Sequence, residues 1–288
     1  MSYPELSRGD RGDEVERLQT LLNRVGAMLE ADGIFGGGSQ HGVKYAQSLA
    51  EQAQTGTADE ALWRWLDAQP EPFPLLHPNG IAFIAQKETG GLSYYEQFTR
   101  WPHFPGERSG ITIGVGYDLR FASEANFRAL WGAHLPESVI AELSKDIGKK
   151  GSKARVQQLK EMGIEVPFSA AWPVFVSHTL PDYYAQTKAI YPSLPRLPEL
   201  CRSALVSLVY NRGPSLKEVD ERRTEMRTIR DLLVEADRAD SHAAKERVLA
   251  KVANELLAMR RLWPNSEGLR KRREAEAQLW LQGLERWV

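Results

Sequence analysis

The sequence predicts a mostly helical α+β protein, in which a small three-helix domain precedes a larger helical domain with a small β-hairpin. Three observations lead to this prediction. Apolar residues recur at helical spacing before a proline-rich stretch, and helix-like segments return after residue 200. Between them, GITIGVGYDL (110–119) alternates β-branched residues with glycine. The predicted domains are residues 1–68 and 79–288, joined by a proline-rich linker at 69–78.

Composition excludes several classes of function. The chain of 288 residues carries 37 basic and 38 acidic residues. Its net charge of −1 therefore creates no overall positive electrostatic potential that would attract nucleic acid. The longest strongly apolar stretch, ALVSLVY (204–210), is too short to span a bilayer. We therefore expect neither nucleic acid nor membrane as a partner. The single cysteine, Cys201, precedes this apolar run and is expected to be a buried small residue.

The N-terminus, MSYPELSRGDRGDEVERLQ, has no apolar core of the kind found in secretory signals. The protein is therefore expected to be synthesised in the cytoplasm without a signal peptide. A substrate outside the cell would then require a separate means of delivery.

The first domain is predicted to hold three short helices. DEVERLQTLLNRVG (13–26) has apolar side chains at helical spacing and ends on glycine, while HGVKYAQSLAEQA (41–53) and ADEALWRWLDA (58–68) read as two more helices. DGIFG (32–36) reads as a turn in which Asp32 caps, Gly33 supplies an unusual φ, and Ile34 and Phe35 anchor the turn in the core.

These elements resemble the peptidoglycan-binding module found beside many cell-wall hydrolases, over nearly all of residues 6–66. Gly9-Asp10, Gly12, Leu18-Gln19 and DGIFG carry the resemblance, and GGGS (36–39) departs from it. The resemblance implies a wall-binding role for four residues: Asp32, Gly33, Phe35 and Gln47. GIFGGGS could also suggest a phosphate loop, but the lysine that such a loop requires is missing.

Beyond the linker, NGIAFIAQKETGG (79–91) predicts a helix with Glu88 near its end, before Gly90 and Gly91. A carboxyl group at the end of an apolar helix is partly desolvated, which would raise its pKa towards that of a general acid. A solvated helix-terminal glutamate is the alternative interpretation of this residue alone.

The order of Glu88, a segment with tyrosines and the glycine-containing hairpin resembles the phage-type lysozymes and the related muramidase domain of the bacteriocin pesticin. Thr112 follows Glu88 by 24 residues and precedes Asp118 by six. Phage enzymes usually place the aspartate before the threonine, and a histidine where Tyr117 stands. In this chain no aspartate lies between Glu88 and Thr112, where the only carboxylates are Glu96 and Glu107. The pesticin-like variant, which has its aspartate just after the strand, therefore fits better, with Asp118 in that position.

The C-terminal half extends this resemblance over residues 79–280. ALVSLVYNRGPSL (204–216) is similar to the helix that lines the cleft in these enzymes, and RRTEMRTIRDLL and GLRKRREAEAQLW are similar to their later helices. The resemblance implies substrate-binding roles for Asn211 and Arg212, although each could simply be structural. The charged run RKRREAE could equally be a solvated helix face.

A polysaccharide strand lying against the hairpin would explain its glycines, because Gly114 and Gly116 would leave room for a sugar ring. Thr112 and Asp118 would then point into the cleft opposite Glu88. Glycosidic cleavage needs an acid on the leaving oxygen and a second group on the opposite face of the sugar. We expect Glu88 to be the acid, Asp118 the base or electrostatic stabiliser, and Thr112 the group that positions water. Tyr94 and Tyr117 are expected to contact substrate.

The sequence therefore predicts an N-acetylmuramidase that cuts the β-1,4 bond between N-acetylmuramic acid and N-acetylglucosamine. No metal or cofactor is implied, because the six histidines show no ligand spacing. A lytic transglycosylase acting on the same bond and a non-catalytic wall-binding protein remain alternatives, while a zinc amidase or cysteine peptidase lacks the required motifs. The absence of a signal fits a phage endolysin released by a holin. It equally fits an injected antibacterial effector, whose further partners would be an immunity protein and a secretion apparatus.

Overall fold

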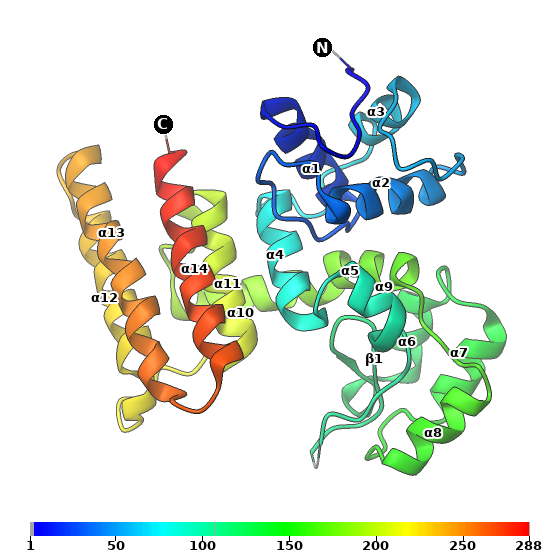
Figure 1. Cartoon of the computed structure of the whole chain (residues 1–288). Helices are drawn as coiled ribbons and strands as arrows, with labels where there is room; N and C mark the ends of the chain where they lie inside the picture. Colours follow the sequence, from blue (N-terminus) through cyan, green and yellow to red (C-terminus); the bar gives the residue numbers. More distant parts are fainter. Residues whose placement is uncertain (1–2, 107, 288) are drawn as a thin grey trace. The chain divides into compact units, whose positions relative to one another are not determined.

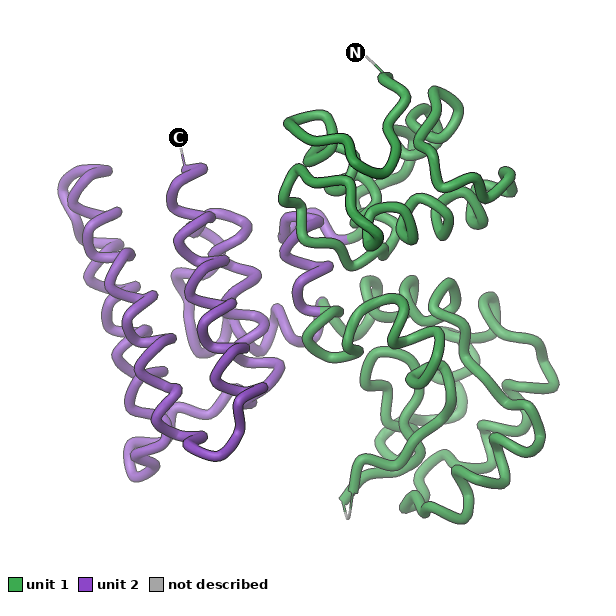
Figure 2. The backbone as a smooth tube through the Cα atoms, viewed as in Figure 1, with its two compact units in different colours: residues 1–72, 85–180 green, residues 73–84, 181–288 purple. Residues whose placement is uncertain are grey.

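The computed structural model describes residues 3–106 and 108–287, which divide into two compact units (Figure 2). Unit 1 comprises residues 1–72 and 85–180, and unit 2 comprises residues 73–84 and 181–288. The boundary between the units crosses α4 (Pro78–Thr89). The N-terminal residues thus share one compact unit with residues 85–180, whereas the sequence predicted a division at the linker.

Unit 1 begins with the three predicted helices, α1 (Asp13–Arg24), α2 (Gly37–Leu49) and α3 (Glu60–Asp67) (Figure 1). Their facing apolar side chains form a core that includes Val15, Leu18, Leu22, Val43, Leu62 and Trp63. Gly26, at a φ of 95°, follows the end of α1 as expected. α2 starts four residues earlier than the predicted segment because the extended backbone at Gly36 already caps it.

The DGIFG turn forms largely as predicted. Asp32 Oδ1 accepts a hydrogen bond from Ile34 N at 2.9 Å, and Gly33 has a φ of 69°. Phe35 is buried in the core of the three helices. Ile34, however, is 40% exposed, so the prediction that it anchors the turn in the core is wrong.

The rest of unit 1 is a series of short elements around a β-hairpin. After α4 come α5 (Leu92–Tyr94) and a π-helical turn at Tyr95–Thr99. The hairpin consists of β1 (Thr112–Ile113) and β2 (Tyr117–Asp118), followed by a 3₁₀ turn at Leu119–Phe121. Four further helices and a second π-helical turn complete the unit: α6 (Glu124–Trp131), α7 (Glu137–Ser144), α8 (Lys153–Glu161), α9 (Phe168–Val174) and Phe175–Thr179.

The N-terminal helices pack directly against α9 within unit 1. A Cβ placed on Gly26 would lie 2.8 Å from atoms of both Phe168 and Trp172, so only glycine fits this contact. Trp172 Nε1 donates a hydrogen bond to Arg24 O at 3.2 Å. The three-helix region is therefore joined to the remainder of unit 1 by buried packing.

Unit 2 contains the first part of α4 and a group of long helices. These are α10 (Leu180–Ile190), α11 (Glu199–Arg212), α12 (Thr224–Asp237), α13 (His242–Ala258) and α14 (Glu267–Glu285). α12 packs on α13, α13 on α14, and α14 on α11 (Figure 1). Short 3₁₀ turns occur at Leu194–Arg196, Glu221–Arg223 and Met259–Leu262.

Two close approaches organise unit 2. Gly80 of α4 lies so near Ser203 that a Cβ would be 2.0 Å from the Ser203 hydroxyl, and Gly283 of α14 approaches Cys201 in the same way. Cys201 is buried as predicted, which raises the pKa of its thiol. The linker is also packed, since Phe73 stacks edge-on against Tyr184 with ring centroids 5.6 Å apart. Helices dominate and the described strands form one two-stranded sheet, which confirms the predicted fold class.

No helix of the described residues combines the length and apolar character needed to cross a lipid bilayer.

Candidate active site

The hairpin brings three polar residues into one row. In the antiparallel pairing of β1 and β2, Thr112 lies directly opposite Asp118. On its other side, Thr112 pairs with His103, whose backbone N–H and carbonyl exchange hydrogen bonds with those of Thr112 at 3.0 and 2.8 Å. Directly opposed residues project their side chains to the same face. The side chains of His103, Thr112 and Asp118 therefore share one face of this small sheet.

Thr112 stands at the centre of the row and is 4% exposed. Because its backbone hydrogen bonds are made to His103, its pairing with Asp118 is of the non-hydrogen-bonded kind, in which side chains approach most closely. Its Oγ1 atom is buried and has no hydrogen-bond partner among the described residues. A buried hydroxyl without a hydrogen-bond partner is energetically costly.

His103 was not predicted from the sequence. Burial lowers the pKa of its imidazole, and a hydrogen bond with the backbone of Trp101 and, after it, the negative charge of Asp118 oppose that shift more weakly. Its Nδ1 atom is buried and makes no hydrogen bond within the described part of the chain. His103 lies nine residues before Thr112, and only the path of the intervening loop makes them neighbours. The sequence offers no periodic pattern from which this pairing could be found.

Asp118 has a structural role besides any chemical one. Its Oδ1 accepts hydrogen bonds from the backbone N–H groups of Gly110 and Arg120, each at 2.9 Å. The carboxylate thereby ties the start of the hairpin to the turn that follows β2. Asp118 is half-buried, in keeping with its expected position at the strand end.

Glu88 is the penultimate residue of α4 and is half-buried. The apolar face expected of this helix comprises Ile81, Phe83, Ile84 and Ala85. Ile81, Ile84 and Ala85 are buried, whereas Phe83 is half-buried. Gly90 and Gly91 follow with φ values of 83° and 96°, so the helix ends where the sequence indicated. Glu88, Thr112 and Asp118 all belong to unit 1.

The glycines of the hairpin serve the protein's own packing. Gly114 is buried, and a Cβ there would lie 2.8 Å from the Trp131 ring, so the prediction that it leaves room for a sugar is wrong. At Gly110, the groups that approach closely are the Asp118 carboxylate and Arg120. Gly116 is exposed and has a φ of 78°.

Tyr117 is also part of this packing. It is 9% exposed and forms an edge-on contact with Trp131 at a centroid distance of 5.6 Å. Its ring is further covered by Phe127 and His178. The prediction that Tyr117 contacts substrate is therefore not supported by its position, because the hydrophobic core of unit 1 encloses the ring.

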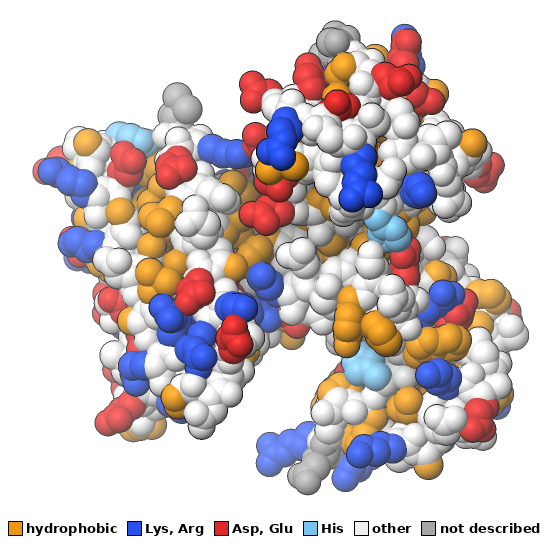
Figure 3. Space-filling view, viewed as in Figure 1, with side chains coloured by type: hydrophobic (Ala, Val, Ile, Leu, Met, Phe, Trp, Pro, Cys, Tyr) orange, Lys and Arg blue, Asp and Glu red, His pale blue; other side chains and the backbone are white. Residues whose placement is uncertain are grey.

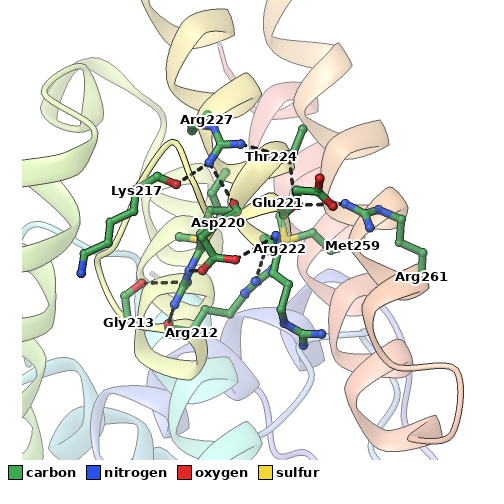
Figure 4. Close-up of polar contacts among 12 residues, drawn as sticks. Arg212, Gly213, Lys217, Asp220, Glu221, Arg222, Thr224, Arg227, Met259 and Arg261 are labelled. Carbon is green, nitrogen blue, oxygen red and sulfur yellow. Dashed lines mark hydrogen bonds and ion pairs between the residues drawn. The ribbon is translucent and has the colours of Figure 1, made fainter.

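Asn211 and Arg212 lie at the end of α11 in unit 2. Figure 4 shows Arg212 within a polar network. Asn211 Oδ1 accepts a hydrogen bond from Arg273 at 3.2 Å. Arg212 donates to the carbonyl of Arg222, and its guanidinium lies 5.1 Å from the Trp263 ring centroid. Burial and neighbouring arginines lower the pKa of Arg212 to about 10. These contacts give both residues a structural function, and substrate binding stays a prediction.

This network belongs to a basic end of unit 2. Figure 3 shows Lys and Arg side chains gathered where α13 ends and α14 begins. Exposed members include Arg260, Arg261 and Lys271. Many are ion-paired, as in the bond from Arg261 to Glu225 at 2.6 Å. The charges of this surface are thus partly compensated within the unit.

All four predicted wall-binding residues support the fold, Asp32 through the hydrogen bonds that its Oδ1 accepts from Ile34 N and Gln19 Nε2 at 2.9 and 2.8 Å. Gly33 donates its N–H to Gln19 Oε1, and Phe35 fills the core. Gln47 is 1% exposed, donates to Thr57 O at 2.9 Å and accepts from Gly56 N at 3.0 Å. The side chains of Phe35 and Gln47 are enclosed, so these two residues serve the module by supporting its fold, and its binding to the wall stays a prediction. Asp32 alone is exposed.

Asp32 lines a pocket of about 330 Å³ in unit 1, and so does Tyr94. One wall comes from the N-terminal helices and the loops between them, and the other from residues 86–94, which include the end of α4. Tyr94 is 53% exposed and lies against Phe98, with ring centroids 4.8 Å apart. Two residues predicted to serve separate sites thus belong to one pocket.

The other carboxylates considered from the sequence have different positions. Glu96, in the π-helical turn, forms a hydrogen bond with His41 of α2, and the distance from Glu96 Oε2 to His41 Nε2 is 2.9 Å. Glu107 lies outside the described residues. Within residues 3–106 and 108–287, no group of three or more His, Cys, Asp and Glu side chains is arranged to hold a metal ion.

Comparisons with known proteins identify the N-terminal region. Residues 11–66 match the family model described as "Putative peptidoglycan binding domain", and residues 83–168 match a "Domain of unknown function (DUF8812)". A solved structure, "Crystal structure of Burkholderia AP3 phage endolysin", aligns over 99% of this chain and 100% of its own. Its identity is 15% and the TM-score is 0.23, which does not establish a shared fold. No curated protein matches the chain.

The chain therefore carries a peptidoglycan-binding domain at its N-terminus, within unit 1. The match of this domain supports peptidoglycan as a binding partner.

Proposed function

We propose that this protein is a peptidoglycan hydrolase that cleaves the β-1,4 bond between N-acetylmuramic acid and N-acetylglucosamine. The observation that supports the proposal most is the register of the hairpin, in which Thr112 pairs with Asp118 on one side and His103 on the other. A hydroxyl, a carboxylate and an imidazole on one face are suited to orient water for attack on a sugar carbon. The peptidoglycan-binding domain in the same compact unit supports the choice of polymer.

In the proposed mechanism, Glu88 protonates the leaving glycosidic oxygen while positive charge develops on the sugar ring. Asp118 accepts a proton from the attacking water or stabilises the ring electrostatically. Thr112 orients that water with its hydroxyl group. His103, whose pKa is lowered by burial, stays neutral at pH 7 and adds a polar partner without a repelling positive charge.

The proposal is tested by digesting purified sacculi and analysing the fragments by mass spectrometry. A muramidase releases fragments with new reducing muramic acid ends. Anhydromuropeptides alone would identify a lytic transglycosylase, and cleaved stem peptides on intact glycans would remove the glycosidase assignment. Co-sedimentation with sacculi without any fragment release would point to a non-catalytic wall-binding protein.

We further propose that the enzyme acts on the wall from the periplasmic side, either as a phage endolysin after holin release or as an injected antibacterial effector. The balanced charge of the chain supports neither setting over the other. Expression in the bacterial cytoplasm, with and without a fused export signal, tests the site of action. Lysis should require export or a holin.

A further inference from the structure

The pocket that contains Asp32 and Tyr94 has no assigned role. Its volume of about 330 Å³ lies at the lower end of the range for small-ligand sites, enough for about one or two sugar rings. Two sets of residues line it. The N-terminal set includes Gln19, Leu29, Glu30, Asp32, Ser39 and His41, and the second set is Gln86, Gly90, Gly91, Leu92, Ser93 and Tyr94.

Direct contacts hold the two walls together. His41 Nε2 and Glu96 Oε2 are 2.9 Å apart, and Gln86 Nε2 donates to Met28 O at 3.5 Å. Thr89 Oγ1 lies 3.3 Å from the sulfur of Met28. Met28 is buried, and its backbone has a φ of 54°. A non-glycine residue held at positive φ indicates a position fixed by its surroundings. The pocket is therefore built from both walls and is not a gap on one of them.

The lining favours a neutral, polyhydroxylated ligand. Gln19 and Ser39 are buried and hydrogen-bonded within the N-terminal helices. The pocket presents the amide of Gln86, the hydroxyl of Ser93 and the carboxylates of Glu30 and Asp32, together with the exposed Tyr94 ring. No Lys or Arg is among the described residues that form it. Such groups donate to and accept from hydroxyl and N-acetyl groups, while an aromatic ring packs against the apolar face of a pyranose. The carboxylates of Glu30 and Asp32 would repel the free carboxylates of a peptidoglycan stem peptide.

The position of the pocket connects it to the proposed acid. Gly90 and Gly91 line the pocket, and they follow Glu88 by two and three residues. A glycan held by both walls is thereby anchored beside the end of α4. Binding energy gained at such a remote subsite can be used to orient the bond that is cleaved.

We propose that this pocket binds N-acetylated sugar rings of the same glycan strand that Glu88 cleaves. The peptidoglycan-binding domain and residues 86–94 then form one extended carbohydrate site, and the domain does more than tether the enzyme to the wall. This inference rests on the proposed function for the identity of the strand, but its binding step can be measured without any cleavage.

The test measures binding of chitohexaose, a β-1,4 oligomer of N-acetylglucosamine, by calorimetry on the full chain carrying Glu88→Gln. In that background, Tyr94→Ala is expected to weaken binding about tenfold, since it removes the aromatic face. Phe121→Ala is the matched control, because Phe121 is 76% exposed and lies outside the pocket. It should leave the affinity unchanged.

A second variant separates a sugar from a cationic group such as the side-chain amine of a stem peptide. Glu30→Gln removes an exposed charge from the pocket. A neutral sugar should bind this variant within about twofold of the parent and be insensitive to salt, whereas an amine would lose affinity and show salt dependence. A free stem peptide serves as the competing probe.

Binding of chitohexaose that is weakened by Tyr94→Ala and spared by Phe121→Ala supports the inference. Absence of chitohexaose binding, equal binding by the Tyr94→Ala variant, or binding of the stem peptide alone would overturn it. The proposed function fails separately, if the wild-type chain releases no reducing ends from sacculi.

Discussion

The N-terminal helices and the hairpin of unit 1 both carry recognisable motifs, but the motif residues have different roles in the two regions. In the helices, the side chains of Phe35 and Gln47 are enclosed and their contacts are made within the domain. At the hairpin, Thr112 Oγ1 and His103 Nδ1 are buried without partners among the described residues. The first motif specifies the fold, whereas the second leaves two buried polar atoms without a hydrogen-bond partner in the described part of the chain.

This difference gives a rule for interpreting motifs in the chain. A motif residue whose hydrogen bonds are all made internally should affect stability when it is changed. A residue at an unsatisfied position should affect activity with little cost in stability. The predictions below test this division, beginning with the largest expected effect.

Replacing Glu88 with glutamine should reduce release of reducing ends from sacculi about a thousandfold to ten-thousandfold. It removes the proton donor to the leaving oxygen, and general acids contribute effects of this order. The thermal midpoint should change little, because the side chain is half-buried and keeps its size. Glu161→Gln, at an exposed position of α8, is the control and should stay within about twofold of wild type. Equal losses in both variants would contradict the role of Glu88.

Replacing Phe35 with alanine should cost about 3–5 kcal/mol of unfolding free energy, as is typical for a buried phenylalanine. Phe35 is 1% exposed in the core of the N-terminal helices. Denaturant titration measures the change. At a temperature where the variant is still folded, its turnover on soluble glycan fragments should be close to wild type. A loss of turnover with full stability would show that this motif forms part of the chemical site.

Replacing Asp118 with asparagine should lower turnover about a hundredfold and leave the fold intact. An amide oxygen can still accept the N–H groups of Gly110 and Arg120, so the hairpin remains closed while the charge is lost. Asp118→Ala removes the acceptor too and should also lower the thermal midpoint. If Asp118→Asn were nearly as active as wild type and Glu107→Gln inactive, the second carboxylate would precede Thr112, as in the phage enzymes.

The local elements of the fold could be predicted from the sequence, because each is determined by residues that are close together in the chain. The helix ending at Thr89, the DGIFG turn and the hairpin all follow from apolar spacing, glycine positions and β-branched residues. What could not be predicted depends on contacts between distant segments. His103 meets Thr112 through a loop, and Gly114 meets Trp131 of a later helix. The pocket shared by Asp32 and Tyr94 also requires the packing of two predicted domains on each other.

That packing can be tested with Gly26→Ala. An added Cβ would lie 2.8 Å from Phe168 and Trp172, so the variant should be destabilised by overpacking as well as by its positive φ of 95°. Gly9→Ala is the matched control, since Gly9 has a φ of 108° but nothing within 4 Å of its Cβ. The difference between the two variants in unfolding free energy should be about 1–3 kcal/mol. Equal destabilisation would show that the N-terminal helices do not pack on α9 in solution.

The smallest expected effect concerns the dependence of stability on pH. Burial lowers the pKa of His103 below the value that an unfolded chain would give it, about 6.5. The unfolded chain therefore binds more protons as the pH falls through 6.5, so stability should decline there until His103 protonates in the folded protein too. His103→Asn should flatten the profile where the pH falls below about 6.5, and His134→Asn, at an exposed position, is the control. Thermal midpoints across this range provide the measurement. If the thermal midpoint of the His103→Asn variant depends on pH as steeply as that of the wild type, the effect belongs to other groups and His103 is in contact with solvent.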